Sequence, residues 1–318
     1  MNKITGAVVE QIRCCPACGE DAFVDLPVPL NRIGEVFFRA HGVECSLKRC
    51  RTCGLAFVNP RPAASVLAEF YDQPGYAAHP EADDAFRWAV VNARIAKLPQ
   101  PVMGGRALDV GCGNGLMLEA CRRVGWTCVG MDPSVHGRAV TAGRGFPVYE
   151  SLQHVVLHEA PFDMITLYHV LEHVADLDEF FLVVRPLLKR GGRLVIEVPN
   201  IKSFRVRAFS FLPPAMRRDD DPYRAFPIHL YGFSCPSIKA LLQQHQFRLI
   251  QKTTSGLGIE WSRRSTFSRT DKREVNSDQI EMPLVKSNWR RPARFIWSIM
   301  ERFGWGENLT VTAEVIPK

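Results

Sequence analysis

Short apolar runs alternate with stretches of helical periodicity through the middle of the chain. The apolar runs predict strands that are buried on both faces, at 106–110, 127–131, 147–149, 162–168 and 193–200. Apolar residues at helical spacing predict the elements between them, at 84–98, 116–124, 134–143, 178–188 and 236–245. Regular alternation of strand and helix predicts an α/β fold built on a parallel sheet.

The C-terminal part of the chain predicts two further strands. Residues 247–250 form one apolar run, and 308–315 alternate between apolar and polar side chains. We expect the second run to be the last strand and to lie antiparallel to the rest. The glycine pair Gly191-Gly192 is expected to separate the helix over 178–188 from the strand that follows it.

A glycine-rich turn follows the first apolar strand of this series. Gly111, Gly113 and Gly115 stand at alternate positions, and helical periodicity begins directly after them. Glycine suits a tight turn with positive φ and lets a ligand approach the backbone. The turn also places free N–H groups at a helix N-terminus. By itself such a turn fits dinucleotide binding, nucleotide binding or turn geometry alone.

Two acids make the pattern more specific. Asp109 stands two residues before the first glycine, and Asp132 ends the second apolar strand. A carboxylate at the end of the second strand can accept hydrogen bonds from both hydroxyls of a ribose. The sequence Leu-Asp-Val-Gly-Cys-Gly-Asn-Gly, followed by Val-Gly-Met-Asp, resembles the cofactor site of the class I S-adenosylmethionine-dependent methyltransferases.

The resemblance implies a Rossmann-like fold with a seven-stranded, mostly parallel sheet and an antiparallel last strand. It also implies that S-adenosylmethionine is the cofactor. The residues that it assigns to cofactor binding are Asp109, Gly111, Cys112, Gly113, Gly115, Asp132, Pro133, Tyr168 and His169. Adenine contacts are expected from Glu150, Ser151 or Leu152, and the sequence does not choose between them.

Three histidines are candidate catalytic bases. His169 and His173 lie in His-Val-Leu-Glu-His-Val, which resembles the family's segment beneath the methionine part of the cofactor. His229 lies in a phrase that resembles the family's His-Leu-x-x-Phe-Ser, in which Ser234 caps the next helix. A histidine titrates near neutral pH and can remove the acceptor proton. Each could instead have a structural role, with Glu172 and His173 paired, and orientation alone could drive transfer without a strict base.

Two Cys-x-x-Cys pairs mark the N-terminal part of the chain. Cys15 and Cys18 form the first pair, and Cys50 and Cys53 form the second. Four thiolates in this arrangement predict a closed, structural Zn²⁺ site, and paired free thiols or a redox couple are the alternative. Cys14 is expected not to be a ligand, although it could replace Cys15.

The region after the second pair resembles a zinc-ribbon subgroup of these methyltransferases. Its motif here is Cys-Gly-Leu-Ala-Phe-Val-Asn-Pro-Arg-Pro, followed by a segment that carries Tyr71 and Tyr76. In that subgroup the tyrosine segment tends to cover the cofactor, so both tyrosines are candidate lid residues. Between the two cysteine pairs, 36–39 show strand-like alternation. We expect a zinc ribbon and lid over 1–80.

The methyltransferase domain is then expected over 81–318, with inserts on the acceptor side at about 201–228 and 256–305. The acidic run 219–221 is either a solvated loop or part of the acceptor site. An amphipathic helix is expected over 293–303. It could pack on the sheet or serve as a lid, a dimer face or a membrane-surface contact.

Composition narrows the class of protein and its partners. Apolar residues make up 46% of the 318 residues and charged residues 23%, as in soluble globular proteins, and no apolar run is long enough to span a bilayer. Without a secretory leader we expect a cytoplasmic protein. The net charge is +7, with the basic excess mostly in the C-terminal third. It fits a solvated surface or an acidic partner, but the absence of a long Lys/Arg tract argues against nucleic acid.

These observations favour methyl transfer to a small-molecule acceptor, with a sugar or secondary metabolite suggested by the zinc-ribbon resemblance. An RNA methyltransferase that grips its substrate through the zinc ribbon is the first alternative. A cofactor-binding module without catalysis is the second. The sequence leaves open the acceptor, the methylated atom and the oligomeric state.

Overall fold

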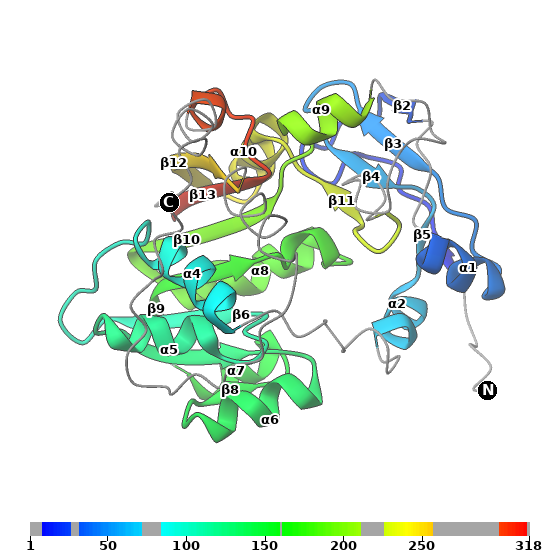
Figure 1. Ribbon diagram of the computed structural model, residues 1–318. Helices are drawn as coiled ribbons and strands as arrows, with labels where there is room; N and C mark the ends of the chain where they lie inside the picture. Colours follow the sequence, from blue (N-terminus) through cyan, green and yellow to red (C-terminus); the bar gives the residue numbers. More distant parts are fainter. Residues whose placement is uncertain are drawn as a thin grey trace, which may run out of the picture.

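The computed structural model describes residues 8–26, 32–71, 84–159, 161–210, 226–256 and 299–316. Figure 1 shows a large α/β body and a smaller N-terminal module beside it. Within the described residues no helix is long and apolar enough to cross a membrane.

The body contains a seven-stranded sheet with the order β12-β13-β10-β9-β6-β7-β8. Its strands are β6 (Arg106–Val110), β7 (Thr127–Met131), β8 (Val148–Tyr149), β9 (Phe162–Tyr168), β10 (Leu188–Pro199), β12 (Phe247–Ser255) and β13 (Asn308–Val315). The five strands from β10 to β8 pair in parallel, and β13 pairs antiparallel with both β10 and β12. The predicted fold class is confirmed.

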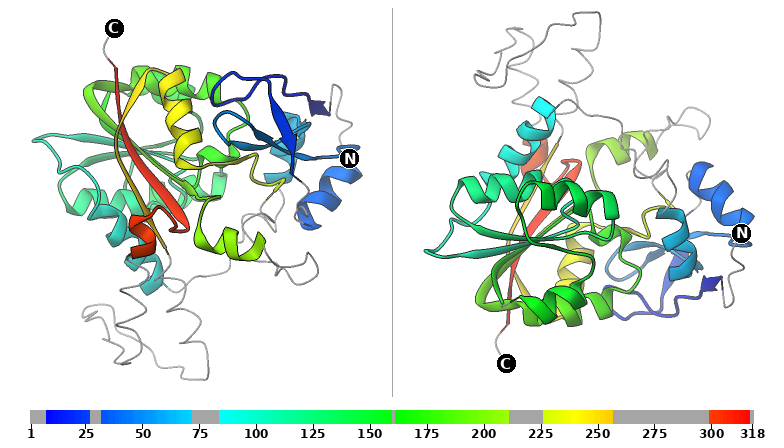
Figure 2. Two further views of the ribbon diagram at one scale, coloured as in Figure 1. Left: turned by 90° about the horizontal axis from the view of Figure 1, so that it is seen from above. Right: turned by 90° about the horizontal axis from the view of Figure 1, so that it is seen from below.

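Helices cover both faces of this sheet (Figure 2). One core cluster joins the sheet to α7 (Leu152–His158), α8 (Leu177–Leu187) and α10 (Cys235–Gln244). The other joins it to α4 (Asp84–Ile95) and α5 (Leu116–Arg123). Alternation along each strand produces the two cores: in β6, Leu108 packs into the first and Ala107 into the second.

Polar side chains define where several of these helices begin. Ser134 caps α6 (Val135–Gly143), with its hydroxyl accepting from the Gly137 N–H. Ser234 begins α10 in a capping box with Ser237, as its place in the sequence predicted. Ser134 stands two residues after Asp132, and Phe233, which precedes Ser234, pairs with Asn200 at the end of β10, so both helices begin at the same edge of the sheet.

The N-terminal module is built around a four-stranded antiparallel sheet with the order β11-β4-β3-β2. Three strands come from the module itself: β2 (Phe23–Asp25), β3 (Leu47–Cys50) and β4 (Ala56–Val58). The fourth, β11 (Tyr231–Gly232), comes from the large body. The module also holds the pair β1 (Val9–Glu10) and β5 (Arg61–Pro62), and the helices α1 (Arg32–Ala40) and α2 (Ala64–Tyr71). Pairing between β4 and β11 fastens the module to the body.

Two local predictions are wrong. The segment 36–39, expected to be strand-like, belongs to helix α1, where Phe38 is buried against Phe70 while Val36 is exposed. A run of four residues is too short for its alternation to exclude a helix. Gly191 and Gly192 lie inside β10 rather than before it, at a shift in its register with β9.

Some predictions fall on residues outside the described part of the chain. These are Tyr76, the acidic run 219–221 and most of the insert 256–305. The described part of 201–228 includes α9 (Phe204–Ser210), and a helical turn covers 299–302.

Candidate functional site

The predicted cofactor residues meet at the carboxyl edge of the parallel strands. The glycine turn follows β6, Asp132 follows β7, and Tyr168 ends β9 with His169 directly after it. Neighbouring parallel strands end on the same side, so three segments far apart in the sequence come together there. Ligands of open α/β sheets bind at this edge.

Glycine is required in the turn for two different reasons. Gly111 has a φ of 72°, and a Cβ there would lie 2.5 Å from the Val170 side chain. A side chain at this position would therefore displace the segment that carries His169 and His173. Gly113 has a φ of 53°, and no atom lies within 4 Å of the place that its Cβ would take. That open space leaves the backbone accessible to a ligand.

The two acids have different environments. The Asp109 carboxylate is buried and accepts a 2.6 Å hydrogen bond from the Thr166 hydroxyl. Burial raises the pKa of Asp109 to about 7. The Asp132 carboxylate accepts from the backbone N–H of Gly113 at 2.7 Å and of Ser134 at 2.9 Å. Each Asp132 oxygen keeps a further lone pair, so this carboxylate fits a ribose diol.

An ionic network fixes His169. Its backbone is left-handed, with a φ of 57°, and its two ring nitrogens lie 3.4 Å from Glu172 Oε1 and 3.6 Å from Glu197 Oε1. Burial opposes a charge on the imidazole, but the two carboxylates outweigh it and raise the pKa of His169 to about 9. A histidine with this pKa is mostly protonated at neutral pH, which favours a positioning role over proton removal.

Glu197 is the centre of this network. Arg94 donates to it from α4 at 2.6 and 2.9 Å, and Thr310 donates from β13 at 2.9 Å. Burial opposes ionisation, but His169 and Arg94 lower the pKa of Glu197 to about 2. The Arg94 guanidinium also lies 4.3 Å from the centre of the Tyr168 ring. Arg94 and Glu197 thus form a charged framework that holds Tyr168 and His169.

His173 and His229 meet beside this framework. His173 lies in the short helix η1 (Leu171–His173), and His229 lies two residues before β11. Their ring centroids are 4.7 Å apart in an edge-to-face arrangement. Burial, together with the neighbouring His173, lowers the pKa of His229 to about 4. His229 is therefore neutral at physiological pH, so a ring nitrogen can accept a hydrogen bond, but a pKa this low makes it a weak base.

Glu172, His173 and His229 could also hold a cation. Their ligand atoms lie within 4.8 Å of one another. Glu172 is only 1% exposed, and neither carboxylate oxygen accepts a hydrogen bond of ordinary geometry from the described residues. A buried carboxylate beside two imidazoles is a donor set suited to a divalent metal.

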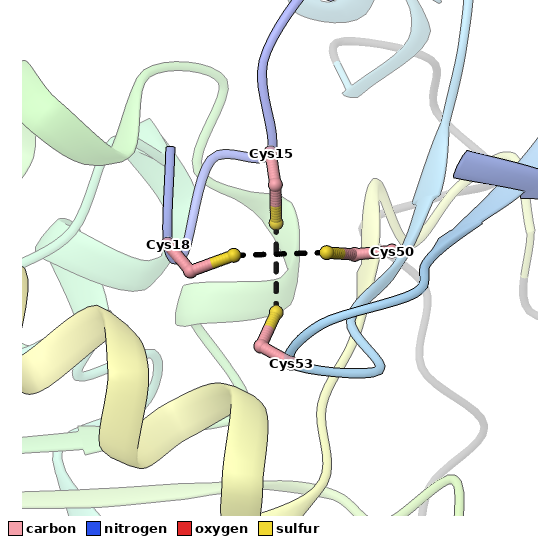
Figure 3. A group of neighbouring side chains, drawn as sticks. All are labelled: Cys15, Cys18, Cys50 and Cys53. Carbon is pink, nitrogen blue, oxygen red and sulfur yellow. Dashed lines mark hydrogen bonds between the residues drawn. The ribbon is translucent and has the colours of Figure 1, made fainter. Parts of the chain in front are cut away.

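The four predicted cysteine ligands converge in the N-terminal module. Figure 3 shows their sulfur atoms pointing toward a common centre. The Cys15 and Cys53 sulfurs are 3.5 Å apart, and the Cys18 and Cys50 sulfurs are 3.6 Å apart. A tetrahedral ion with Zn–S bonds of about 2.3 Å would place its sulfurs about 3.8 Å apart. The cluster therefore fits a zinc ribbon, and Cys14 is exposed and outside it.

The cysteine module contacts the histidine pair through one short segment. Leu230 accepts a hydrogen bond from Val58 N–H of β4 at 3.0 Å and donates its own N–H to Glu172 O at 2.7 Å. The next residue, Tyr231, accepts from the Arg61 guanidinium at 2.9 Å and donates to Ala175 O at 3.0 Å. The position of His229 thus depends on the N-terminal module.

The sequence matches the family described as "Methyltransferase domain" over residues 84–252. That match covers more than half of the chain and includes the glycine turn, Asp132 and all three histidines. The chain belongs to this methyltransferase family. The fold and the match together identify a class I S-adenosylmethionine-dependent methyltransferase with an N-terminal four-cysteine module.

Curated relatives share the central part of the methyltransferase. The ubiquinone biosynthesis O-methyltransferase of Rhizobium etli is 35% identical over 114 residues, which are 34% of this chain and 46% of that protein. The protein of the same name from Agrobacterium fabrum is 36% identical over 124 residues, which are 37% of this chain and 49% of that protein. This methyltransferase therefore spans about half the length of the curated relatives that it matches.

A solved structure shares the fold. The complex between the Haloferax volcanii Trm112 methyltransferase activator and a putative methyltransferase contains a chain that superposes with a TM-score of 0.51. The sequences are 14% identical, and the alignment covers 79% of this chain and 98% of that chain. At this identity the similarity concerns the fold alone.

Sequence reasoning missed the residues that hold the site in place. Arg94, Thr166, Glu197 and Thr310 carry no motif, and their partners lie far away in the sequence. One signal was present: Glu197 interrupts the apolar run of the fifth predicted strand, and a buried charge requires partners.

Proposed function

We propose that this methyltransferase transfers the methyl group of S-adenosylmethionine to an oxygen atom of a small-molecule acceptor. The observation that carries the proposal is the meeting of the glycine turn, Asp132 and the His169–His173 segment at one edge of the sheet, with His229 beside them. The name O-methyltransferase on the curated relatives favours oxygen as the methylated atom.

In this proposal the glycine turn and Asp132 bind the cofactor, with Asp132 accepting from the ribose. The bound cofactor supplies an electrophilic methyl group on a sulfonium. Cys112, Gly115 and Pro133 belong to the same loops and contribute shape and backbone, while Tyr168 and His169 form the wall after β9. The cationic His169 is assigned to positioning, not to proton removal.

Acceptor activation falls to His173 and His229. Either imidazole can take the hydroxyl proton as the oxygen attacks the methyl group. The Glu172–His173–His229 cluster also permits a divalent cation, which would lower the pKa of a bound hydroxyl. The two routes differ in one observable, since only the second depends on added metal after treatment with a chelator.

The four cysteines are proposed to bind one structural Zn²⁺. Their role is to hold β3, β4 and, through β4, the segment that carries His229. An RNA methyltransferase that grips its substrate through this module is the second candidate function. Against it, the module's sheet includes strand β11 of the large body, which favours a supporting role over that of a separate RNA-binding domain.

A transfer assay tests the proposed function. Purified protein is incubated with S-adenosylmethionine that carries a labelled methyl group and with fractionated cell extract. Label in the small-molecule fraction supports the proposal. Label in RNA would support the second candidate, and absence of label from every fraction, with the cofactor still bound, would favour a module without catalysis.

A further inference from the structure

A cavity of about 640 Å³ opens at the end of β10, where Asn200 follows the strand that carries Glu197. Its wall includes Lys97, three residues after Arg94, and Asn200, three residues after Glu197. The end of β12, helix α9, the start of α10 and the turn before β13 complete it. The cofactor residues described above are not among its lining residues, so this is a second, adjoining space.

The frame of the cavity is held by polar side chains. Asn200 Nδ2 donates to the backbone oxygens of Gly304 at 3.0 Å and Gly306 at 2.8 Å. The Thr254 hydroxyl donates to Glu301 O at 2.6 Å. These bonds connect the end of β10, β12 and the segment 301–306, so one wall of this open cavity is held in place.

The lining of the cavity is strongly basic. Five cations from four segments line it: Lys97, Lys202, Arg207, Lys252 and Arg302. Glu301 is its single acidic lining residue among the described part of the chain. Four of the cations, all except Arg207, form no salt bridge with any described residue. Like charges gathered without partners repel one another, and a bound anion would remove that cost.

The volume and the aromatic side chains indicate the size of the ligand. Cavities of this volume accept small molecules. Trp305 lines the wall with the Arg207 guanidinium 5.4 Å from its ring, and Phe303 is 72% exposed. The cavity thus combines several positive charges with apolar surface. This combination suits an organic molecule that carries a multiply charged anionic group.

We infer that this cavity binds a phosphate or diphosphate group of the acceptor. A phosphate group presents several oxygens to several cations at once, whereas a carboxylate has two. The assignment of this anion to the acceptor rests on the proposed function. Phosphate binding by the cavity does not rest on it and can be measured without catalysis.

The test uses inorganic pyrophosphate as the probe and calorimetry on the full chain. The double variant Lys252→Ala/Arg302→Ala removes two exposed cations of the cavity. The control Arg13→Ala/Arg190→Ala removes two exposed cations that do not line the cavity, so the change in net charge is the same in both double variants. Circular dichroism checks folding, and the single variant Lys202→Ala replaces the double variant if that one does not fold.

We expect the wild-type protein to bind pyrophosphate with an affinity that falls as salt rises. The double variant should bind at least tenfold more weakly and the control within twofold of wild type, with S-adenosylmethionine affinity unchanged in both. Absence of pyrophosphate binding by the wild type, or equal loss in both double variants, would overturn the inference. Specific pyrophosphate binding by a protein that transfers no methyl group would support the cavity and count against the proposed function.

Discussion

Replacing Asp132 with alanine tests the cofactor end of the proposed site. Asp132 is 8% exposed, and each of its oxygens already accepts one backbone N–H. In the proposal each oxygen also accepts one ribose hydroxyl. Hydrogen bonds to a charged partner contribute about 1.5–3 kcal/mol each, so two of them are worth about 3–6 kcal/mol. We expect S-adenosylmethionine affinity to fall by about 10²–10⁴-fold.

Alanine at this position also removes the partner of the Gly113 and Ser134 N–H groups, so the loss could in principle come from a distorted turn. Asp132→Asn separates the two effects, because it keeps an acceptor oxygen but loses the charge. Asp163→Ala is the matched control. This carboxylate accepts from Arg106 N–H and from Lys189, each at 2.8 Å, but lies at the amino end of β9.

The assay is titration calorimetry of each folded variant with S-adenosylmethionine. Asp132→Ala should bind most weakly, Asp132→Asn should lie between it and wild type, and Asp163→Ala should bind as wild type does. Unchanged affinity in folded Asp132→Ala would refute the ribose contact. An equal loss of S-adenosylmethionine affinity in Asp163→Ala would show that the effect follows from removing any hydrogen-bonded carboxylate near a strand end.

Three further predictions concern catalysis, metal binding and stability. His229→Ala should lower kcat by about 10²–10⁴-fold at unchanged cofactor affinity, whereas kcat of the exposed control His158→Ala should not change; equal rates in both would exclude a catalytic His229. Cys50→Ser should release one Zn²⁺ per chain by metal analysis and lower the melting temperature; wild-type protein without metal would refute the site. The Asp109 pKa of about 7 in the folded protein exceeds its value in the unfolded chain. The free energy of unfolding should therefore fall by up to about 4 kcal/mol as pH rises from 4 to 7. Denaturant titrations of Asp109→Asn should show a weaker dependence on pH.

The cofactor side of the site was predictable because its signals are local. Gly111, Gly113 and Gly115 lie within five residues, and their conformational demands can be read without knowing any partner. Asp132 follows the next strand of the same β-α-β unit. The four cysteines carry a spacing that few other functions share. In each case a short segment contains the chemistry and the backbone geometry together.

The framework behind the site was not predictable because its contacts are long-range. Arg94 and Glu197 are 103 residues apart, and Thr310 lies 113 residues beyond Glu197. Each of these residues looks ordinary in its own element. The environment of His169 is long-range only in part, because Glu172 stands three residues after it whereas Glu197 comes from β10.

Strand β11 connects the cysteine module, which has a local sequence signal, to the site, whose contacts are long-range. It contains two residues, too few for a periodic signal, yet it joins the cysteine module to the large body. Leu230 uses its carbonyl oxygen for β4 and its N–H for the Glu172 backbone, so a single residue bridges the module and the acid beside the histidine pair. Within the described part of the chain, neither Asp132 nor the glycine turn forms such a bond to the module. If the four cysteines hold Zn²⁺, loss of the metal should disturb His229 and acceptor turnover before it weakens cofactor binding. This order is expected if the module supports the acceptor side. It is not expected if the module is a separate domain that binds the substrate.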